Sequence, residues 1–319
     1  MISRRTTLLG LGACVAGCGR REPPPGAVAS DAVAVASAPP PAPSASSEAR
    51  PPDVDVATRE IAFTDADGGP QHCVLVTAKP PGAGRLPLLV ALHGLGESKK
   101  GLSGGAWGWV RDYWLDRALR RLSAPPLVAE DFLGFVTRSR LAQLNAQLAK
   151  QPFSGLAIAC LYTPDLLNPR SLDNARAFGR FVVEHALPRL RREPDVDGSR
   201  TGIDGVSLGG RLSLLVGLAH PKEFQSIGSL QAALQLSEAR ELARRAKAAV
   251  LENPALALRL VTSERDFYKD EIGAFHEALA KVGVSHEHDV LPGPHDYPWN
   301  RGPGAIEMCL FADRAARAR

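Results

Sequence analysis

The chain has 319 residues, of which 45% are hydrophobic, enough to fill the core of one large domain with tails or of two small domains. Its formal net charge is only +4, from 38 Lys and Arg against 34 Asp and Glu, and these residues are spread along the chain. A nucleic-acid-binding surface needs a basic stripe, so the composition argues against a nucleic-acid partner.

The first seventeen residues are typical of an export signal. Arg4 and Arg5 precede a short run of small apolar residues that ends at Gly17. This run is too short to remain in a bilayer as a spanning helix. The paired arginines resemble a twin-arginine export signal. We therefore expect the protein to leave the cytoplasm.

The end of this signal resembles a bacterial lipobox, Val15-Ala16-Gly17-Cys18, in which the cysteine is lipidated and becomes the mature N-terminus. Leu11-Gly12-Ala13-Cys14 is a weaker copy of the same pattern, and a plain cleaved signal with incidental cysteines remains an alternative. We expect a lipid on Cys18 to anchor the protein to a membrane of the bacterial cell envelope, facing the periplasm or the cell surface.

Residues 18–55 are predicted to be a disordered linker, because from Glu22 onward they are almost all Pro, Ala, Ser and Val. Such a segment buries too little apolar surface to offset its ordering entropy. The folded domain is expected over 56–319. It contains three scattered cysteines, Cys73, Cys160 and Cys309, without metal-ligand spacing. One disulfide and three buried free thiols are both compatible with this pattern.

In chain order, the domain begins with two strand-like runs around a turn-rich segment, which predict a hairpin. Short continuous apolar runs then alternate with amphipathic stretches, a pattern that predicts buried parallel strands separated by helices. The strands are expected at 56–63, 71–77, 86–92, 156–162, 201–206, 225–230 and 256–262, with a last one containing His286 and His288. The helices are expected at 172–192, 211–219, 238–250, 269–282 and 305–317. The fold class is therefore α/β, with a mostly parallel central sheet covered by helices on both faces.

Residues 97–155 do not follow the alternation and are rich in aromatic side chains. Two helices are predicted in this insert, near Trp109–Leu122 and Ala129–Lys150. The insert is interpreted either as a helical cap that shapes a substrate pocket or as a layer packed on the sheet, because aromatic anchors serve both purposes.

Gly205-Val206-Ser207-Leu208-Gly209 matches the G-x-S-x-G pattern between a predicted strand and a predicted helix. A serine at such a sharp turn projects its hydroxyl over the end of the sheet, and glycines on either side leave room for the turn. The helix N-terminus behind it favours negative charge. We therefore predict Ser207 as a nucleophile.

A serine nucleophile needs a base, and the base needs an acid that orients it. In hydrolases with this elbow the chain order is Ser, then Asp or Glu, then His. Of the histidines after Ser207, only His295 lies in a loop beyond the last strand, so it is the predicted base. Asp266 follows the preceding strand and is the predicted acid, with Glu264 and Asp270 as alternatives.

The oxyanion hole requires two backbone N–H groups. Leu208, directly after the nucleophile, is predicted to supply one of them. The second is assigned to Leu95, with Gly94 as the alternative, because these residues follow an early buried strand and glycine lets the backbone approach a substrate. His93 precedes the serine and is interpreted as a structural hydrogen bonder.

These motifs resemble the esterase D branch of the α/β-hydrolases, which includes feruloyl, acetyl xylan and enterochelin esterases and S-formylglutathione hydrolases. The resemblance rests on His93-Gly94 after its strand, the Gly205–Gly210 elbow, the Ala219-His220-Pro221 helix end and the loop Gly293–Trp299, and it covers about 70–312. Leu208, where that branch often has methionine, and the 97–155 insert depart from the family. The resemblance implies the α/β-hydrolase fold and an esterase that works through an acyl-enzyme without a cofactor.

The sequence thus predicts a serine esterase that cleaves a small-molecule or polymer-linked carboxylic ester. Two alternatives remain open. One is a hydrolase-like binding lipoprotein that has lost catalysis, although all triad candidates are present. The other is a peptidase or acyltransferase on the same fold, since a fold does not fix its chemistry.

Overall fold

The structure is a computed structural model that describes residues 54–64 and 69–318. The predicted export signal, Cys18 and the linker up to residue 53 lie outside the described residues. Among the helices that are described, none is long and apolar enough to cross a membrane.

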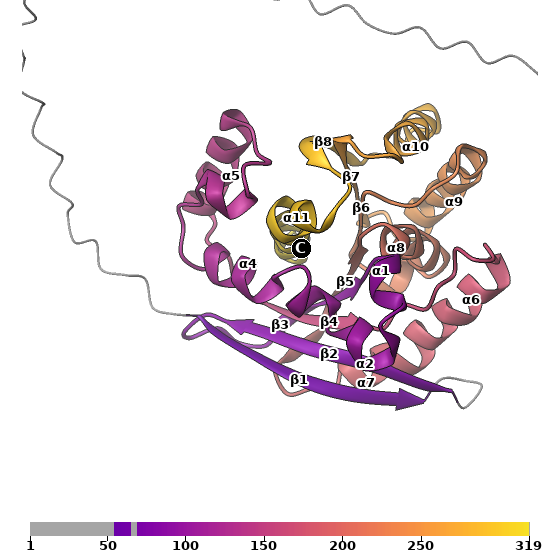
Figure 1. The fold of residues 1–319 in the computed structure, drawn as a ribbon. Coiled ribbons are helices and arrows are strands. Elements are labelled where there is room, and N and C mark those ends of the chain that lie inside the picture. The colour runs from indigo at the N-terminus through magenta and orange to yellow at the C-terminus, as the bar shows by residue number, and fades with distance from the viewer. Residues whose placement is uncertain (1–53, 65–68, 319) are drawn as a thin grey trace, which may run out of the picture. The chain divides into compact units, whose positions relative to one another are not determined.

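Eight strands form one sheet in the order β1-β2-β4-β3-β5-β6-β7-β8 (Figure 1). Their bounds are β1 Asp55–Thr64, β2 Pro70–Lys79, β3 Leu86–Leu92, β4 Leu156–Leu161, β5 Val196–Gly205, β6 Ser226–Leu230, β7 Ala257–Arg265 and β8 Glu287–Pro294. The β1–β2 and β2–β4 pairs are antiparallel, and every other neighbouring pair is parallel. The predicted hairpin and the mostly parallel sheet are confirmed.

Strand β3 shows why the sheet is buried on both faces. Successive side chains of a strand point to opposite faces. Leu88, Val90 and Leu92 therefore join the apolar core on one face, while Leu89 and Ala91 join the core on the other. All seven residues of the strand are buried, which explains its continuous apolar sequence.

Helices cover both faces of this sheet (Figure 1). The first face carries α6 Leu172–Arg180, α7 Leu187–Leu190, α8 Leu208–Ala219, α9 Ala239–Glu252 and α10 Lys269–Lys281, with a π-helical segment, Phe181–Ala186, between α6 and α7. The second face carries α2 Gly101–Ala106, α3 Gly108–Arg111, α4 Leu115–Leu122, α5 Arg138–Lys150 and α12 Ala305–Arg317. Short elements complete the chain: α1 Leu95–Ser98, α11 Tyr297–Trp299, the 3₁₀ turns Ala129–Phe132, Pro221–Glu223 and Leu236–Glu238, and the π-helical Asn300–Gly304.

The insert differs from the two long helices predicted for it. The first is broken at Trp114, which has a left-handed φ of 53° that a right-handed helix cannot contain. The second is interrupted by positive φ angles at Leu133 and Gly134, and α5 begins only after Thr137, whose hydroxyl caps the N–H of Arg140. Nothing at Trp114 in the sequence marks the first break, whereas Gly134 marks the second.

Side chains of the insert lie in the same core as the second face of the sheet. Trp109 and Leu119 are fully buried there, together with Leu144, Ala91 and Trp299. The insert is therefore a layer on the sheet, continuous with the core around α12.

The three cysteines of the domain are free and buried. Burial raises the pKa of the thiols of Cys73, Cys160 and Cys309. Of the two possibilities that the sequence left open, free thiols are the one found.

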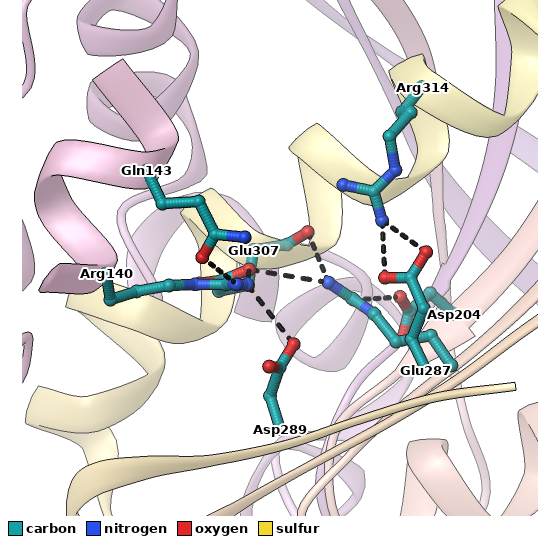
Figure 2. Close-up of polar contacts among 8 residues, drawn as sticks. Arg140, Gln143, Asp204, Glu287, Asp289, Glu307 and Arg314 are labelled. Carbon is teal, nitrogen blue, oxygen red and sulfur yellow. Dashed lines mark hydrogen bonds and ion pairs between the residues drawn. The ribbon is translucent and has the colours of Figure 1, made fainter. Parts of the chain in front are cut away.

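Buried charged side chains connect β5, β7 and α12 (Figure 2). Arg259 donates to Asp204 Oδ2 at 2.9 Å and to the Glu307 carbonyl at 2.7 Å. Arg140 continues the network by donating to Glu307 Oε2 at 2.7 Å and to Asp289 Oδ2 at 3.2 Å. Burial raises the pKa of Asp204 to about 6, although the Arg259 guanidinium opposes the rise.

Candidate active site

Ser207 lies at the sharp turn between β5 and α8, with φ 57° and ψ −114°. A non-glycine residue at positive φ is strained, and such strain persists only where surrounding bonds fix it. The Ser207 N–H donates to the Leu230 carbonyl at 2.9 Å, and the Gly209 N–H donates to the Val206 carbonyl at 2.8 Å. These bonds hold the serine above the carboxyl end of the sheet.

Two glycines of the elbow are required by close backbone contacts. A Cβ on Gly209 would lie 2.2 Å from the Leu92 carbonyl oxygen, and a Cβ on Gly205 would lie 2.6 Å from backbone atoms of Gly209. Backbone atoms cannot move aside as a flexible side chain can. The glycine spacing seen in the sequence therefore reflects the packing of α8 against the end of β3.

Asp266 and His295 come together although they are far apart in the sequence. His295 Nδ1 lies 2.7 Å from Asp266 Oδ1. The same oxygen accepts the Tyr268 N–H at 2.9 Å, and Oδ2 accepts the Thr262 hydroxyl at 2.7 Å. Asp266 follows β7 directly and His295 follows β8, so the parallel pairing of these strands brings the two loops side by side.

The alternative acids and bases lie elsewhere. Glu264 and Asp270 are exposed, and Asp270 is in the first turn of α10, where the sequence analysis expected it. His276 of α10 is hydrogen-bonded to His286 rather than to any residue of the elbow. His220 ends α8, at the opposite end of this helix from Ser207.

Aromatic rings enclose the imidazole of His295. The Phe267 ring stacks on it with centroids 4.2 Å apart, and the Tyr268 ring meets it edge-on at 5.7 Å. Phe267 is itself 67% exposed. These rings restrict the imidazole on one side and give the mouth of the site an apolar surface.

Gln231 holds the loop that carries His295, and the sequence analysis missed it. Its side-chain amide donates to the Pro294 carbonyl at 2.9 Å and to the Ser263 hydroxyl at 2.7 Å. Gln231 has a φ of 45° and is fully buried. A lone glutamine after a strand carries no sequence signal, although its position at the end of β6 places it between the elbow and the loop.

The two N–H groups predicted for the oxyanion hole occupy equivalent positions. Leu208 and Leu95 are the first residues of α8 and α1, where an N–H has no partner within its own helix. The Gly94 N–H, in contrast, donates to the Tyr113 hydroxyl at 3.2 Å. A Cβ on Gly94 would lie 3.8 Å from Ser207 Cβ, so this loop passes close to the serine. Of the two alternatives, the geometry favours Leu95 over Gly94.

His93 is fully buried and bonded to backbone on both sides of its ring. Nδ1 lies 2.8 Å from the Gly94 carbonyl, and Nε2 accepts the Thr163 N–H at 2.9 Å. Burial lowers the pKa of His93 to about 4, which keeps the ring neutral. These contacts agree with the structural role that the sequence analysis gave it.

No hydrogen bond joins the Ser207 hydroxyl to His295 among the described residues. His295 Nδ1 is engaged by Asp266, so Nε2 is the nitrogen available to the serine. Hydrogen bonds between catalytic groups are often long without substrate and tighten when substrate binds.

The described residues include no group of three or more His, Cys, Asp or Glu side chains that could hold a metal ion. A cavity of about 300 Å³ lies between α6 and α8, lined by apolar residues and arginines that include Leu172, Leu215 and Arg180. Its lining includes neither Ser207 nor His295, so we assign the reaction site from the arrangement of polar groups and not from cavity size.

Comparisons with known proteins found one sequence family and a set of similar folds. The sequence family described as "Putative esterase" matches residues 163–301, less than half of the chain, including Ser207, Asp266 and His295. No curated protein matches the sequence.

Solved structures of three esterases have a similar fold. The S-formylglutathione hydrolase FrmB of Staphylococcus aureus is 14% identical, with a TM-score of 0.56 over 83% of this chain and 99% of that one. A ferulic acid esterase is 15% identical, with a TM-score of 0.58 over 82% and 99%. The enterobactin esterase FES of Shigella flexneri is 16% identical, with a TM-score of 0.55 over 82% of this chain and 60% of that one.

The predicted α/β-hydrolase fold and the predicted resemblance to its esterase branch are confirmed. The family match also confirms the predicted enzyme class, carboxylic ester hydrolase.

Proposed function

We propose that this esterase of the α/β-hydrolase fold cleaves carboxylic esters through a covalent acyl-enzyme on Ser207. In this mechanism the Ser207 hydroxyl attacks the ester carbonyl while His295 Nε2 takes its proton. His295 returns the proton to the departing alcohol, and water then releases the acid by the reverse sequence. Asp266 keeps the imidazole in the required tautomer and orientation.

The observation that carries the proposal is the strained conformation of Ser207 at the start of α8, close to the segment that begins α1. The φ of 57° turns the serine out of the strand, Leu208 follows it as the first residue of α8, and Gly94, whose Cβ would lie 3.8 Å from Ser207 Cβ, precedes Leu95, the first residue of α1. Negative charge that develops on the carbonyl oxygen is stabilised by donors fixed in advance. The 2.7 Å contact between Asp266 and His295 supports the assignment of the base.

A fluorophosphonate probe tests the nucleophile. We expect one probe molecule per chain, attached to Ser207 and identified by mass spectrometry of the digested protein, because the phosphonyl group mimics the tetrahedral intermediate. His295→Ala should slow the labelling strongly, since the hydroxyl then has no base. A folded sample that the probe leaves unmodified would instead favour the non-catalytic binding protein.

The names of the structurally similar proteins suggest which ester substrates to test. They name S-formylglutathione, ferulic acid and enterobactin as the compounds on which those proteins act. Turnover of a panel of acetyl, butyryl and feruloyl esters would define the acyl group that this chain prefers, and matched amides would separate an esterase from a peptidase.

We also propose that the protein is exported and held at a membrane by a lipid on Cys18. The basic start, the short apolar run and the small residues before Cys18 support this location. Expressed in a bacterium, the native chain should sediment with membranes, and Cys18→Ala should move it to the soluble fraction. Cys14→Ala is the matched control, and release by that variant in place of Cys18→Ala would assign the anchor to the other cysteine.

A further inference from the structure

Glu97 is a buried carboxylate in α1, directly after the segment Gly94–Gly96 that carries the candidate donor Leu95 and is called the oxyanion loop below, and none of the chemistry above uses it. Its side chain is 1% exposed. Its Oε2 accepts the hydroxyl of Tyr113, and its Oε1 accepts the hydroxyl of Tyr297 at 2.6 Å. The only cation near it is Lys100, at 3.8 Å, among the residues that the structure describes. Burying a carboxylate costs free energy. We therefore expect one that is held by two phenols to do more than stabilise the fold.

Tyr113 connects Glu97 to the backbone of the oxyanion loop. The Tyr113 hydroxyl donates to Glu97 and accepts the Gly94 N–H at 3.2 Å. Burial and the nearby Glu97 raise the pKa of Tyr113 well above its usual value, so the phenol keeps the proton that it donates. Because the proton is committed to Glu97, the lone pairs of this oxygen face Gly94.

The peptides on both sides of Gly94 are therefore fixed. Tyr113 holds the N–H of the first, and His93 Nδ1 holds the carbonyl of the second at 2.8 Å. The N–H of a trans peptide points opposite to its carbonyl. His93 therefore fixes the direction of the Leu95 N–H, the candidate oxyanion donor, and Tyr113 fixes the peptide directly before it.

Tyr297 connects the same carboxylate to the loop that carries His295. Tyr297 lies two residues after His295 and begins α11. Its ring lies 5.8 Å from the ring of Tyr113, so the two phenols approach Glu97 together. One carboxylate thus bonds to Tyr113 of the insert and to Tyr297 of the histidine loop, while its own backbone lies in α1, two residues after Leu95.

The backbone is shaped to hold this cluster. A Cβ on Gly108 would lie 2.5 Å from Glu97 Cγ, and a Cβ on Gly96 would lie 2.6 Å from the Tyr297 hydroxyl oxygen. Glycines at both positions leave the space that the carboxylate and the phenol occupy.

We propose that Glu97 is a positioning residue, which acts through Tyr113 and Tyr297 to fix the oxyanion loop and the histidine loop relative to each other. The inference rests on the proposed serine-esterase function, because it assigns the Leu95 N–H to the oxyanion. Donors must be in place before charge develops, and a displacement of about 1 Å can lower the rate about 100-fold.

Tyr113→Phe tests the link to the oxyanion loop, because it removes one hydroxyl and keeps the ring. We expect kcat for p-nitrophenyl acetate to fall about 10- to 100-fold, with KM changed by less than about threefold. The rate of fluorophosphonate labelling should fall by a similar factor, since the phosphonyl oxygen occupies the same site. Tyr162→Phe is the matched control: its hydroxyl donates to the Ser98 carbonyl at 3.2 Å, in the same short helix α1, and not to the Glu97 carboxylate.

Glu97→Gln tests the carboxylate itself. An amide replaces one carboxylate oxygen by an NH2 donor, so at least one phenol hydroxyl loses the acceptor that it has in the native protein. The double variant Glu97→Gln with Tyr113→Phe should lose much less activity than the product of the two single losses, because both changes break the same link. A purely structural role would lower the melting temperature and leave kcat at 25 °C unchanged, which would overturn the inference.

The two proposals fail in different ways. If the fluorophosphonate does not label Ser207 in the native protein, the proposed function itself is wrong. If the native protein is labelled and Tyr113→Phe and Glu97→Gln match its kcat and labelling rate, Ser207 remains the nucleophile and the role of Glu97 is rejected. Fully multiplicative losses in the double variant would also reject the shared link.

Discussion

Ser207→Ala should lower kcat/KM for p-nitrophenyl esters by about 10⁴- to 10⁶-fold, because the covalent route disappears with its nucleophile. The oxyanion donors and substrate contacts remain, so some acceleration over water should survive. The change removes only one oxygen from a half-buried side chain, and the elbow is held by backbone bonds to Leu230 and Val206. The expected loss is therefore catalytic and should leave the melting temperature nearly unchanged.

Ser213→Ala is the matched control for this experiment. Ser213 lies in α8, the helix that follows Ser207, and its hydroxyl donates to the Gly209 carbonyl at 2.8 Å. Its replacement should change turnover only a few-fold and cost about 1 kcal/mol of stability. Native turnover in Ser207→Ala would reject the nucleophile and with it the whole proposed mechanism.

Arg259→Met should destabilise the domain by about 3–5 kcal/mol, because it leaves the buried Asp204 without its cation and removes one of the two cations beside Glu307. Arg259 is 2% exposed, lies 2.9 Å from Asp204 Oδ2 and 3.7 Å from Glu307 Oε2, and stacks over the Phe311 ring at 4.5 Å. For a domain of this size the melting temperature should fall by about 6–15 °C, measured by calorimetry.

The matched control is Arg314→Ala, which removes a more exposed arginine of an ion pair near the buried network. Arg314 and Glu287 form an ion pair that is partly open to solvent, and Figure 2 shows it beside the buried network. Arg314→Ala should cost less than about 1 kcal/mol. If Arg259→Met and Arg314→Ala lowered the free energy of unfolding equally, burial would not decide the strength of these ion pairs.

The destabilisation by Arg259→Met should also depend on pH. The folded-state pKa of Asp204 is about 6, above its ordinary value, and removing Arg259 raises it further. A raised folded-state pKa adds stability at low pH that is lost as the pH rises through that pKa. The free energy of unfolding of the native protein should therefore exceed that of Arg259→Met by less at pH 5 than at pH 8. The opposite trend would contradict the assigned role of Asp204.

The sequence predicted the sheet well because its strands are short, apolar and buried on both faces. The strand predicted at 86–92 agrees with β3, Leu86–Leu92, and the helix predicted at 305–317 agrees with α12. The insert was predicted poorly: Trp114 adopts a positive φ without glycine or proline to signal it, and the signal that Gly134 gives beside Leu133 was overlooked. Local pattern cannot reveal a break that only tertiary packing stabilises.

The sequence by itself determined the α/β class and the order Ser207, Asp266, His295, because strand–turn–helix patterns and chain order are local properties. Only the tertiary structure decided which groups meet. It brought Asp266 within hydrogen-bonding distance of His295, committed the Gly94 N–H to Tyr113, and gathered Glu97 with Tyr113 and with Tyr297, which is 200 residues away in the chain. The physical reason is that parallel strands carry their loops to one edge of the sheet, and contacts between those loops depend on packing that no single segment encodes.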